Sequence, residues 1–235
     1  MRSRGNSEVL SAKLRAAGEA AAATIVYLGV ALTAVRLIDI SPALNWLTAQ
    51  EATVVSGFLV GSVSQITAVA VIWFALRPVD LARAVGKVRL ASSAEGWYIA
   101  LTIIAVETVL IYGFFLDVGW LALEPSVLNL TGSFAPLLDG VTQEVFFRGY
   151  LILRLARGGY GPPAQLLLSS LAFSAIHVGY MGEAWSTTLP PLLGTLGLGA
   201  ALGWAFIRSG YSLRPPIVAH VAILLIVQPW LALAR

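Results

Sequence analysis

Seven long apolar stretches run through the chain, and each is about long enough to cross a lipid bilayer as a helix. The chain is 58% hydrophobic and only 11% charged, whereas roughly 25% of the residues in a soluble domain are charged. A helix satisfies its own backbone hydrogen bonds in lipid. We therefore predict an all-α polytopic transmembrane helix bundle, a single membrane domain over residues 1–235. The predicted spans are 20–38, 53–76, 97–116, 135–156, 163–181, 189–207 and 215–233.

The basic residues are distributed unevenly between the predicted loops, and this predicts the orientation of the chain. Twelve of the fifteen Lys and Arg residues precede the first span, follow the second or fourth, or lie between the sixth and seventh. Cytoplasmic loops carry such an excess. We expect a cytoplasmic N-terminus, an external C-terminus and a location in a prokaryotic plasma membrane. The dispersed basic residues argue against nucleic-acid binding, and the absence of cysteine excludes disulfides and thiolate chemistry.

Ionisable side chains interrupt three of the apolar stretches. Glu144 and Arg148 lie in the fourth span, and the only two histidines, His177 and His220, lie in the fifth and seventh. A charge placed at mid-bilayer costs about 2.5 to 3.5 kcal/mol on insertion scales, so such residues usually serve a function. We expect the three spans to meet around one buried polar site.

The residue types in this group favour activation of a water molecule. Glu144 precedes Arg148 by four residues, which is the favourable order for an ion pair on one helix face. On its own, this pair is equally consistent with mutual neutralisation and no chemical role. A carboxylate with two imidazoles can activate water by general-base catalysis or on a metal. His177 and His220 are too far apart in sequence to form a local metal-binding motif.

Three short motifs occur in order at these positions. They are Gln143-Glu144-Val145-Phe146-Phe147-Arg148-Gly149, Phe173-Ser174-Ala175-Ile176-His177 and His220-Val221-Ala222-Ile223-Leu224. Here the chain resembles the CAAX-protease and bacteriocin-processing (CPBP or Abi) family of intramembrane endopeptidases, whose pattern is Glu-Glu-x-x-x-Arg, Phe-x-x-x-His and His-x-x-x-Asn. The resemblance covers about 135–225, the motif-bearing core. It implies a membrane-embedded or prenylated protein tail as substrate, and zinc as a possible cofactor with His177 and His220 as ligands.

Two positions depart from the family pattern. The resemblance implies that the first Glu, with the first His, activates water, and that the second His and the Asn hold the oxyanion. Gln143 occupies the position of that Glu, and Leu224 occupies the position of that Asn. An amide takes no proton from water, and loss of a general base costs on the order of 10² to 10⁴ in rate. Loss of one oxyanion donor costs about 10² to 10³.

Two carboxylates could replace the missing base. Asp139 lies one helical turn before Gln143 on the same face, although a polar residue near the outer membrane boundary is the favoured interpretation. Glu144 could turn inward, but its pairing with Arg148 would make it a weaker base. The two histidines converge only if the segment 209–216 dips into the bundle, where irregular backbone is tolerated beside a cavity. We predict that it does.

A second feature, in the sixth span, also has two interpretations. Gly199 and Gly203 form a GxxxG pair, which indicates either a dimerisation face or close packing inside the bundle. The oligomeric state is left open.

Three functions remain as hypotheses. The first is an intramembrane endopeptidase, in which water is polarised beside His177. The second is an inactive relative that binds a peptide or confers immunity, which the residues at 143 and 224 favour. The third is a small transporter, which would predict inverted repeats or broken spans in matching halves.

Overall fold

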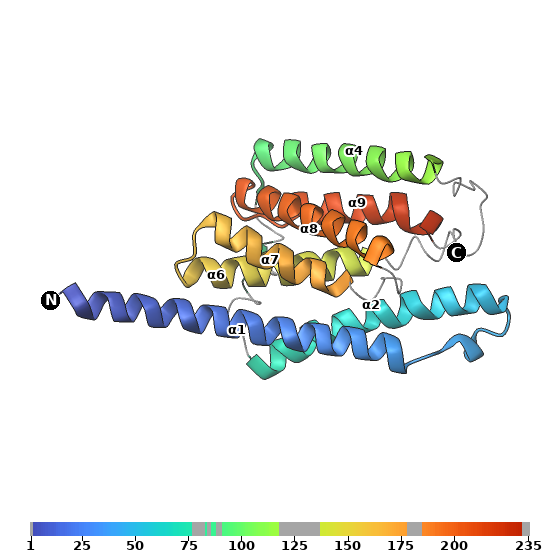
Figure 1. Cartoon of the computed structure of the whole chain (residues 1–235), viewed down its shortest axis with the longest axis horizontal. Helices are drawn as coiled ribbons and strands as arrows, with labels where there is room; N and C mark the ends of the chain where they lie inside the picture. The colour runs from blue at the N-terminus through green and yellow to red at the C-terminus, as the bar shows by residue number, and fades with distance from the viewer. Residues whose placement is uncertain are drawn as a thin grey trace.

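The computed structural model describes residues 2–76, 83, 86–87, 91–117, 137–177 and 185–231, and these contain helices and no strand. Seven helices pass through them, with a short 3-10 turn, η1 (Ser41–Ala43), after the first (Figure 1). They are α1 (Arg2–Leu37), α2 (Ala49–Leu76), α4 (Ala94–Asp117), a helix described from 137 to 157, α7 (Pro162–Ile176), α8 (Trp185–Arg208) and α9 (Arg214–Leu231). The predicted all-α class is confirmed for this part of the chain.

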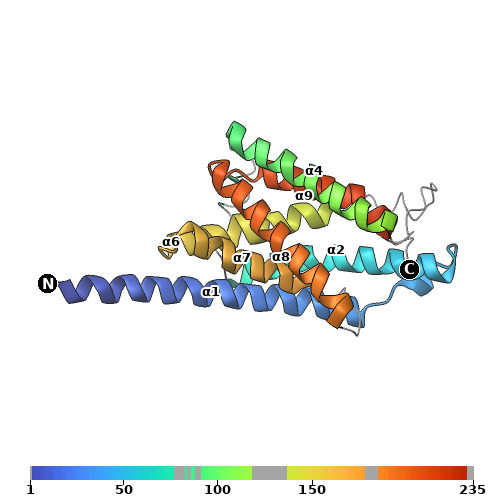
Figure 2. The same cartoon turned by 45° about the horizontal axis from the view of Figure 1, so that its top comes forward.

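The helix over 137–157, called the motif helix, lies in the middle of the bundle. It is α-helical to Glu144, continues as the π-helix η2 (Val145–Ile152) and ends as α6 (Leu153–Arg157). All eight residues of η2 are buried. In Figures 1 and 2 the motif helix and α7 lie between the α1–α2 pair on one side and α4 on the other. The motif helix and α7 therefore carry the first two sequence motifs, and α9 carries the third.

Three helices are long and apolar enough to cross a membrane: Ser7–Ala34, Val55–Phe74 and Ala94–Tyr112. Three shorter apolar helices accompany them, at Pro162–Ile176, Leu192–Arg208 and Arg214–Ile226. These lengths fit an integral membrane protein, while the count of seven spans and the orientation stay predictions. Some positions lie outside the described residues. They are the parts of the predicted spans at 135–136, 178–181 and 232–233, and two acidic residues of predicted loops, Glu124 and Glu183.

The first helix begins much earlier than the predicted span, at Arg2 instead of about residue 20. Its early part is rich in Ala, Leu, Glu, Lys and Arg, which are strong helix formers. Contacts with the C-terminal end of the motif helix hold this early part of α1 in place. Ala16 packs against Gly158, and Glu19 Oε2 accepts a hydrogen bond of 2.6 Å from Arg154 Nε. Helix propensity and these contacts extend α1 beyond the apolar stretch.

The segment between α1 and α2 is irregular apart from η1. Trp46 is 66% exposed there, as expected of a side chain that anchors at a membrane surface. The backbone N–H of Ser41 donates to Asp39 Oδ1 over 2.9 Å, and this hydrogen bond lowers the pKa of the Asp39 carboxyl. The connection is thus held by its own local polar contacts.

The connection between α8 and α9 is largely buried in the protein, although Gly210 is exposed. Ser212 and Leu213 have no exposed surface, and Ser209 is 1% exposed. The Ser212 hydroxyl lies 2.8 Å from that of Ser92, just before α4, and the Ser93 hydroxyl donates to the Arg208 carbonyl over 2.7 Å. These bonds hold the start of α9 against the start of α4, while the depth of the segment in lipid stays a prediction.

The glycine pair of α8 packs inside the bundle, not on an outer face. A Cβ at Gly199 would lie 3.1 Å from Phe173 Cδ1 and 3.2 Å from Ser170 Cα, both on α7. A Cβ at Gly203 would lie 2.8 Å from Leu166 Cδ2. The two glycines therefore let α8 approach α7 closely, as the second interpretation of the motif predicted.

We expect Gly199→Ala to destabilise the protein by about 1 to 3 kcal/mol, because overpacking forces α7 and α8 apart. The matched control is Gly197→Ala on the same helix. A Cβ at Gly197 meets nothing within 4 Å, and Ala is favoured over Gly in a helix by about 1 kcal/mol. Thermal unfolding in detergent should show a loss for the first variant and none for the second; equal behaviour would contradict the packing argument.

Candidate active site

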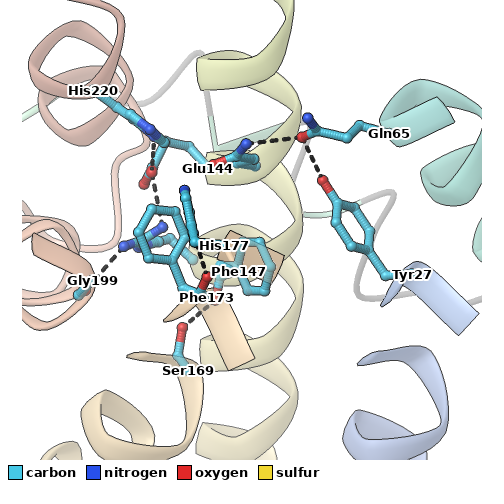
Figure 3. A network of polar contacts seen from close by, with 11 residues as sticks. Tyr27, Gln65, Glu144, Phe147, Ser169, Phe173, His177, Gly199 and His220 are labelled. Atoms are coloured by element: carbon cyan, nitrogen blue, oxygen red, sulfur yellow. Dashed lines mark hydrogen bonds and ion pairs between the residues drawn. The ribbon is translucent and has the colours of Figure 1, made fainter. Parts of the chain in front are cut away.

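The centre of the site is a carboxylate that holds two basic side chains. Glu144 has no exposed surface and lies at the end of the α-helical part of the motif helix. Its Oε1 accepts a hydrogen bond of 2.8 Å from Arg148 Nη1 and lies 2.8 Å from His220 Nδ1 on α9 (Figure 3). The fourth and seventh predicted spans therefore meet at Glu144.

Arg148 completes this cluster on its other side. Its Nη2 donates to the Gly199 carbonyl over 2.9 Å, and its guanidinium lies 4.4 Å from the centre of the Phe173 ring. A buried ion pair offsets its desolvation only when further hydrogen bonds satisfy both partners. Helix α8 supplies one such hydrogen bond and α7 supplies the ring contact, while Arg148 Nε and Glu144 Oε2 have no partner among the described residues. Arg148 lies in the π-helical stretch η2. Such π-helical turns are frequent at functional sites.

The close approach of α9 to the motif helix depends on Gly140. A Cβ at this position would lie 2.8 Å from Val221 Cγ2 and 3.4 Å from Leu224 Cδ1. Gly140 precedes Glu144 by one helical turn, so the bare backbone there lets His220 reach the carboxylate. Leu224, at the position where the family has Asn, packs over Gly140 and supplies no hydrogen-bond donor.

His177 ends α7 and reaches the cluster through an aromatic ring. Its Nδ1 lies 2.8 Å from the Phe173 carbonyl oxygen. A carbonyl only accepts, so Nδ1 carries the proton and Nε2 of the neutral ring carries the lone pair. The Phe173 ring centre lies 4.8 Å from that of His177 and 5.5 Å from that of His220. Both imidazoles therefore belong to one environment, as Figure 3 shows.

The antiparallel register of α7 and the motif helix sets the level of His177. The Ser169 hydroxyl donates to the Phe147 carbonyl over 2.8 Å, and the Phe147 and Phe173 ring centres are 5.4 Å apart. Because the two helices are antiparallel, one turn toward the C-terminus of α7 matches one turn toward the N-terminus of the motif helix. His177 is two turns beyond Ser169 and is therefore about level with Asp139, which is two turns before Phe147.

Gln143 faces a different part of the bundle from Glu144. Its Nε2 donates to Gln65 Oε1 on α2 over 2.9 Å, and the Tyr27 hydroxyl on α1 donates to the same oxygen over 2.8 Å. Gln65 and Tyr27 were not among the residues predicted from the sequence. The available signal was the group of polar residues inside the second apolar stretch, where Ser56, Ser62, Ser64 and Gln65 are all buried.

Asp139 lies one turn before Gln143 on the same face. Its side chain is 5% exposed and hydrogen-bonded to Ser62 of α2. It is thus buried against α2 and is not a surface residue at the end of a helix. The structure brings Glu144, Arg148 and His220 into direct contact and His177 beside them, and it directs Gln143 and Asp139 toward α2.

Three buried side-chain oxygens of the motif helix have no hydrogen-bond partner in the described part of the chain. They are Asp139 Oδ1, Gln143 Oε1 and Glu144 Oε2. Buried polar atoms are normally paired with protein or water. These acceptors can therefore receive hydrogen bonds from a water molecule or from the N–H groups of a bound peptide.

The donor set among the described residues does not fit a zinc ion. Catalytic zinc is typically held by three protein ligands and a water. Among the residues with described positions, no group of three His, Cys, Asp or Glu side chains is close enough to hold a metal. The chemistry of the site is therefore derived from its side chains and water.

Fold and site together define an all-helical membrane protein with a buried Glu–Arg–His cluster among its central helices. Residues 125–226 match the family model described as type II CAAX prenyl endopeptidase, Rce1-like. Over these residues the resemblance to the CAAX-protease family that was drawn from the three motifs is confirmed. No curated protein and no solved structure matches it.

Proposed function

We propose that the protein is a CAAX-type intramembrane endopeptidase that hydrolyses a peptide bond near the membrane-embedded tail of a protein. One observation carries the proposal: two imidazoles share the Phe173 ring, and one of them is fixed by the buried Glu144. Apolar residues would pack better at this place, so packing alone does not account for such a group. Its place among apolar helices fits a substrate that comes from the lipid.

The chemistry follows from the orientation of the two rings. The lone pair on His177 Nε2 accepts a hydrogen bond from the attacking water. By the family resemblance, His220 holds the oxyanion that forms on the peptide carbonyl, and its bond to Glu144 fixes the ring. Gln143 Oε1, which lacks a donor among the described residues, can accept a hydrogen bond from substrate or water. The amide orients its partner but takes no proton.

A second function is favoured by two specific residues. Gln143 cannot act as the base that the family has at this position, and Leu224 packs on Gly140 and donates no hydrogen bond. A relative that binds a peptide without cutting it, as an immunity or carrier protein, needs neither group. The fold and the polar cluster would then serve binding alone.

Gln143→Glu separates the two functions. We expect the variant to fold, because rotation of the Gln65 amide turns its NH₂ toward the new carboxylate. Purified parent and variant in detergent would be incubated with quenched fluorescent peptides that end in a farnesylated CaaX tail. We expect cleavage by the parent and faster cleavage by the variant, by up to about 10²-fold, because a carboxylate returns to the position of the general base.

Each outcome of this experiment favours a different function. Cleavage by the parent supports the endopeptidase, and cleavage by the variant alone supports the binding protein. If neither cleaves any peptide while both remain folded, the peptidase assignment of this site is wrong.

A further inference from the structure

Asp139 is a buried carboxylate that has no cationic partner among the described residues. Its side chain is 5% exposed, and none of the ion pairs found among the described residues includes it. Ser62 forms a hydrogen bond with the carboxylate, but Oδ1 has no donor among the described residues. A buried carboxylate with an unsatisfied oxygen costs several kcal/mol. Asp139 Oδ1 therefore requires a hydrogen-bond donor from outside the described residues.

The surroundings of Asp139 indicate what this donor is. Gln143 Oε1, one turn along the same helix face, also lacks a donor. Two acceptors without a donor select a molecule that donates hydrogen bonds, and water is the smallest of these. Counted from the bond between Ser169 and Phe147, His177 lies about level with Asp139, so this water lies at the level of the His177 imidazole.

The other carboxylate of the motif helix already has its own partners. Glu144 Oε1 accepts from Arg148 and bonds to His220, so Glu144 holds these side chains in place. Glu107, on α4, is not part of the motif helix. Asp139 is therefore the carboxylate that remains for proton transfer at Gln143.

We propose that Asp139 is the general base of this protein and replaces the first Glu of the family one helical turn away. The inference rests on the proposed function. As the water oxygen bonds to the scissile carbonyl carbon, one O–H bond breaks and its proton moves to Asp139 Oδ1. The carbonyl π electrons move to oxygen. When the tetrahedral species collapses, the C–N bond breaks and Asp139 returns the proton to the leaving nitrogen.

The test moves the carboxylate between the two positions. Asp139→Asn should lower the rate of cleavage of the farnesylated peptides by about 10² to 10⁴-fold. The double variant Asp139→Asn with Gln143→Glu should recover the parent rate to within about tenfold. The matched control is Glu107→Gln, an acid-to-amide change in another helix, which should leave the rate within about twofold of the parent. Thermal unfolding checks that each variant is folded.

Each result decides the inference. Loss in Asp139→Asn together with recovery in the double variant supports it. Parent-like cleavage by Asp139→Asn, or loss without recovery in folded protein, overturns the role of Asp139 and leaves the endopeptidase in place. A parent that cleaves nothing while Gln143→Glu cleaves overturns both, because Asp139 then supplies no base.

Discussion

Arg148→Ala is expected to destabilise the protein by about 3 to 5 kcal/mol, because the substitution leaves the carboxylate of Glu144 buried without its counter-charge. A loss of this size is a large part of the roughly 5 to 15 kcal/mol that stabilises a typical folded protein. Both side chains have no exposed surface, and Arg148 Nη1 lies 2.8 Å from Glu144 Oε1. The bond to the Gly199 carbonyl and the contact with Phe173 are lost as well. Thermal unfolding and the yield of monodisperse protein in detergent measure the effect.

A second Arg–Glu pair in the same chain provides the control. Arg208 Nε donates to Glu95 over 2.7 Å, with side chains 44% and 51% exposed. Exposed pairs are worth about 0 to 1 kcal/mol, so Arg208→Ala should change stability little. The double variant Glu144→Gln with Arg148→Met removes both buried charges and should be more stable than Arg148→Ala alone. A mild effect of Arg148→Ala would contradict the buried ion pair.

The sequence predicts the helices and the composition of the centre well, because both follow from local rules. Apolar length indicates the helices. The spacing of Glu144 and Arg148 places them on one face, and their ion pair is present. The rarity of charge in apolar segments directs attention to His177 and His220 before any coordinates are known. The family assignment follows from the same residues.

The partners of these residues depend on tertiary packing, which spacing alone does not reveal. Gln65 and Tyr27 are 38 residues apart and meet only because α1 packs on α2. The π-helical stretch from Val145 to Ile152 has no simple sequence signature. Asp139 could be placed on the face of Gln143 from the sequence, but whether that face met lipid or α2 depended on the packing of other helices.

The geometry of the two histidines leads to the second large effect. His177→Ala is expected to lower the rate of peptide cleavage by about 10² to 10⁴-fold, because the attacking water loses the acceptor at Nε2. Folding should change by about 1 kcal/mol, which is the typical net contribution of a hydrogen bond such as the one between Nδ1 and the Phe173 carbonyl. The measurement is the cleavage rate of the farnesylated peptides beside thermal unfolding of the same sample.

His220→Ala makes the matched comparison, because it removes the other imidazole. His220 is 2% exposed and bonds to the buried Glu144, so its loss leaves a charged acceptor less satisfied, and such losses cost about 1 to 3 kcal/mol. We therefore expect both stability and cleavage to fall in His220→Ala, but cleavage alone in His177→Ala. Equal losses of stability in the two variants would indicate that His177 is a packing residue. Unchanged cleavage in folded His177→Ala would place the attacking water elsewhere.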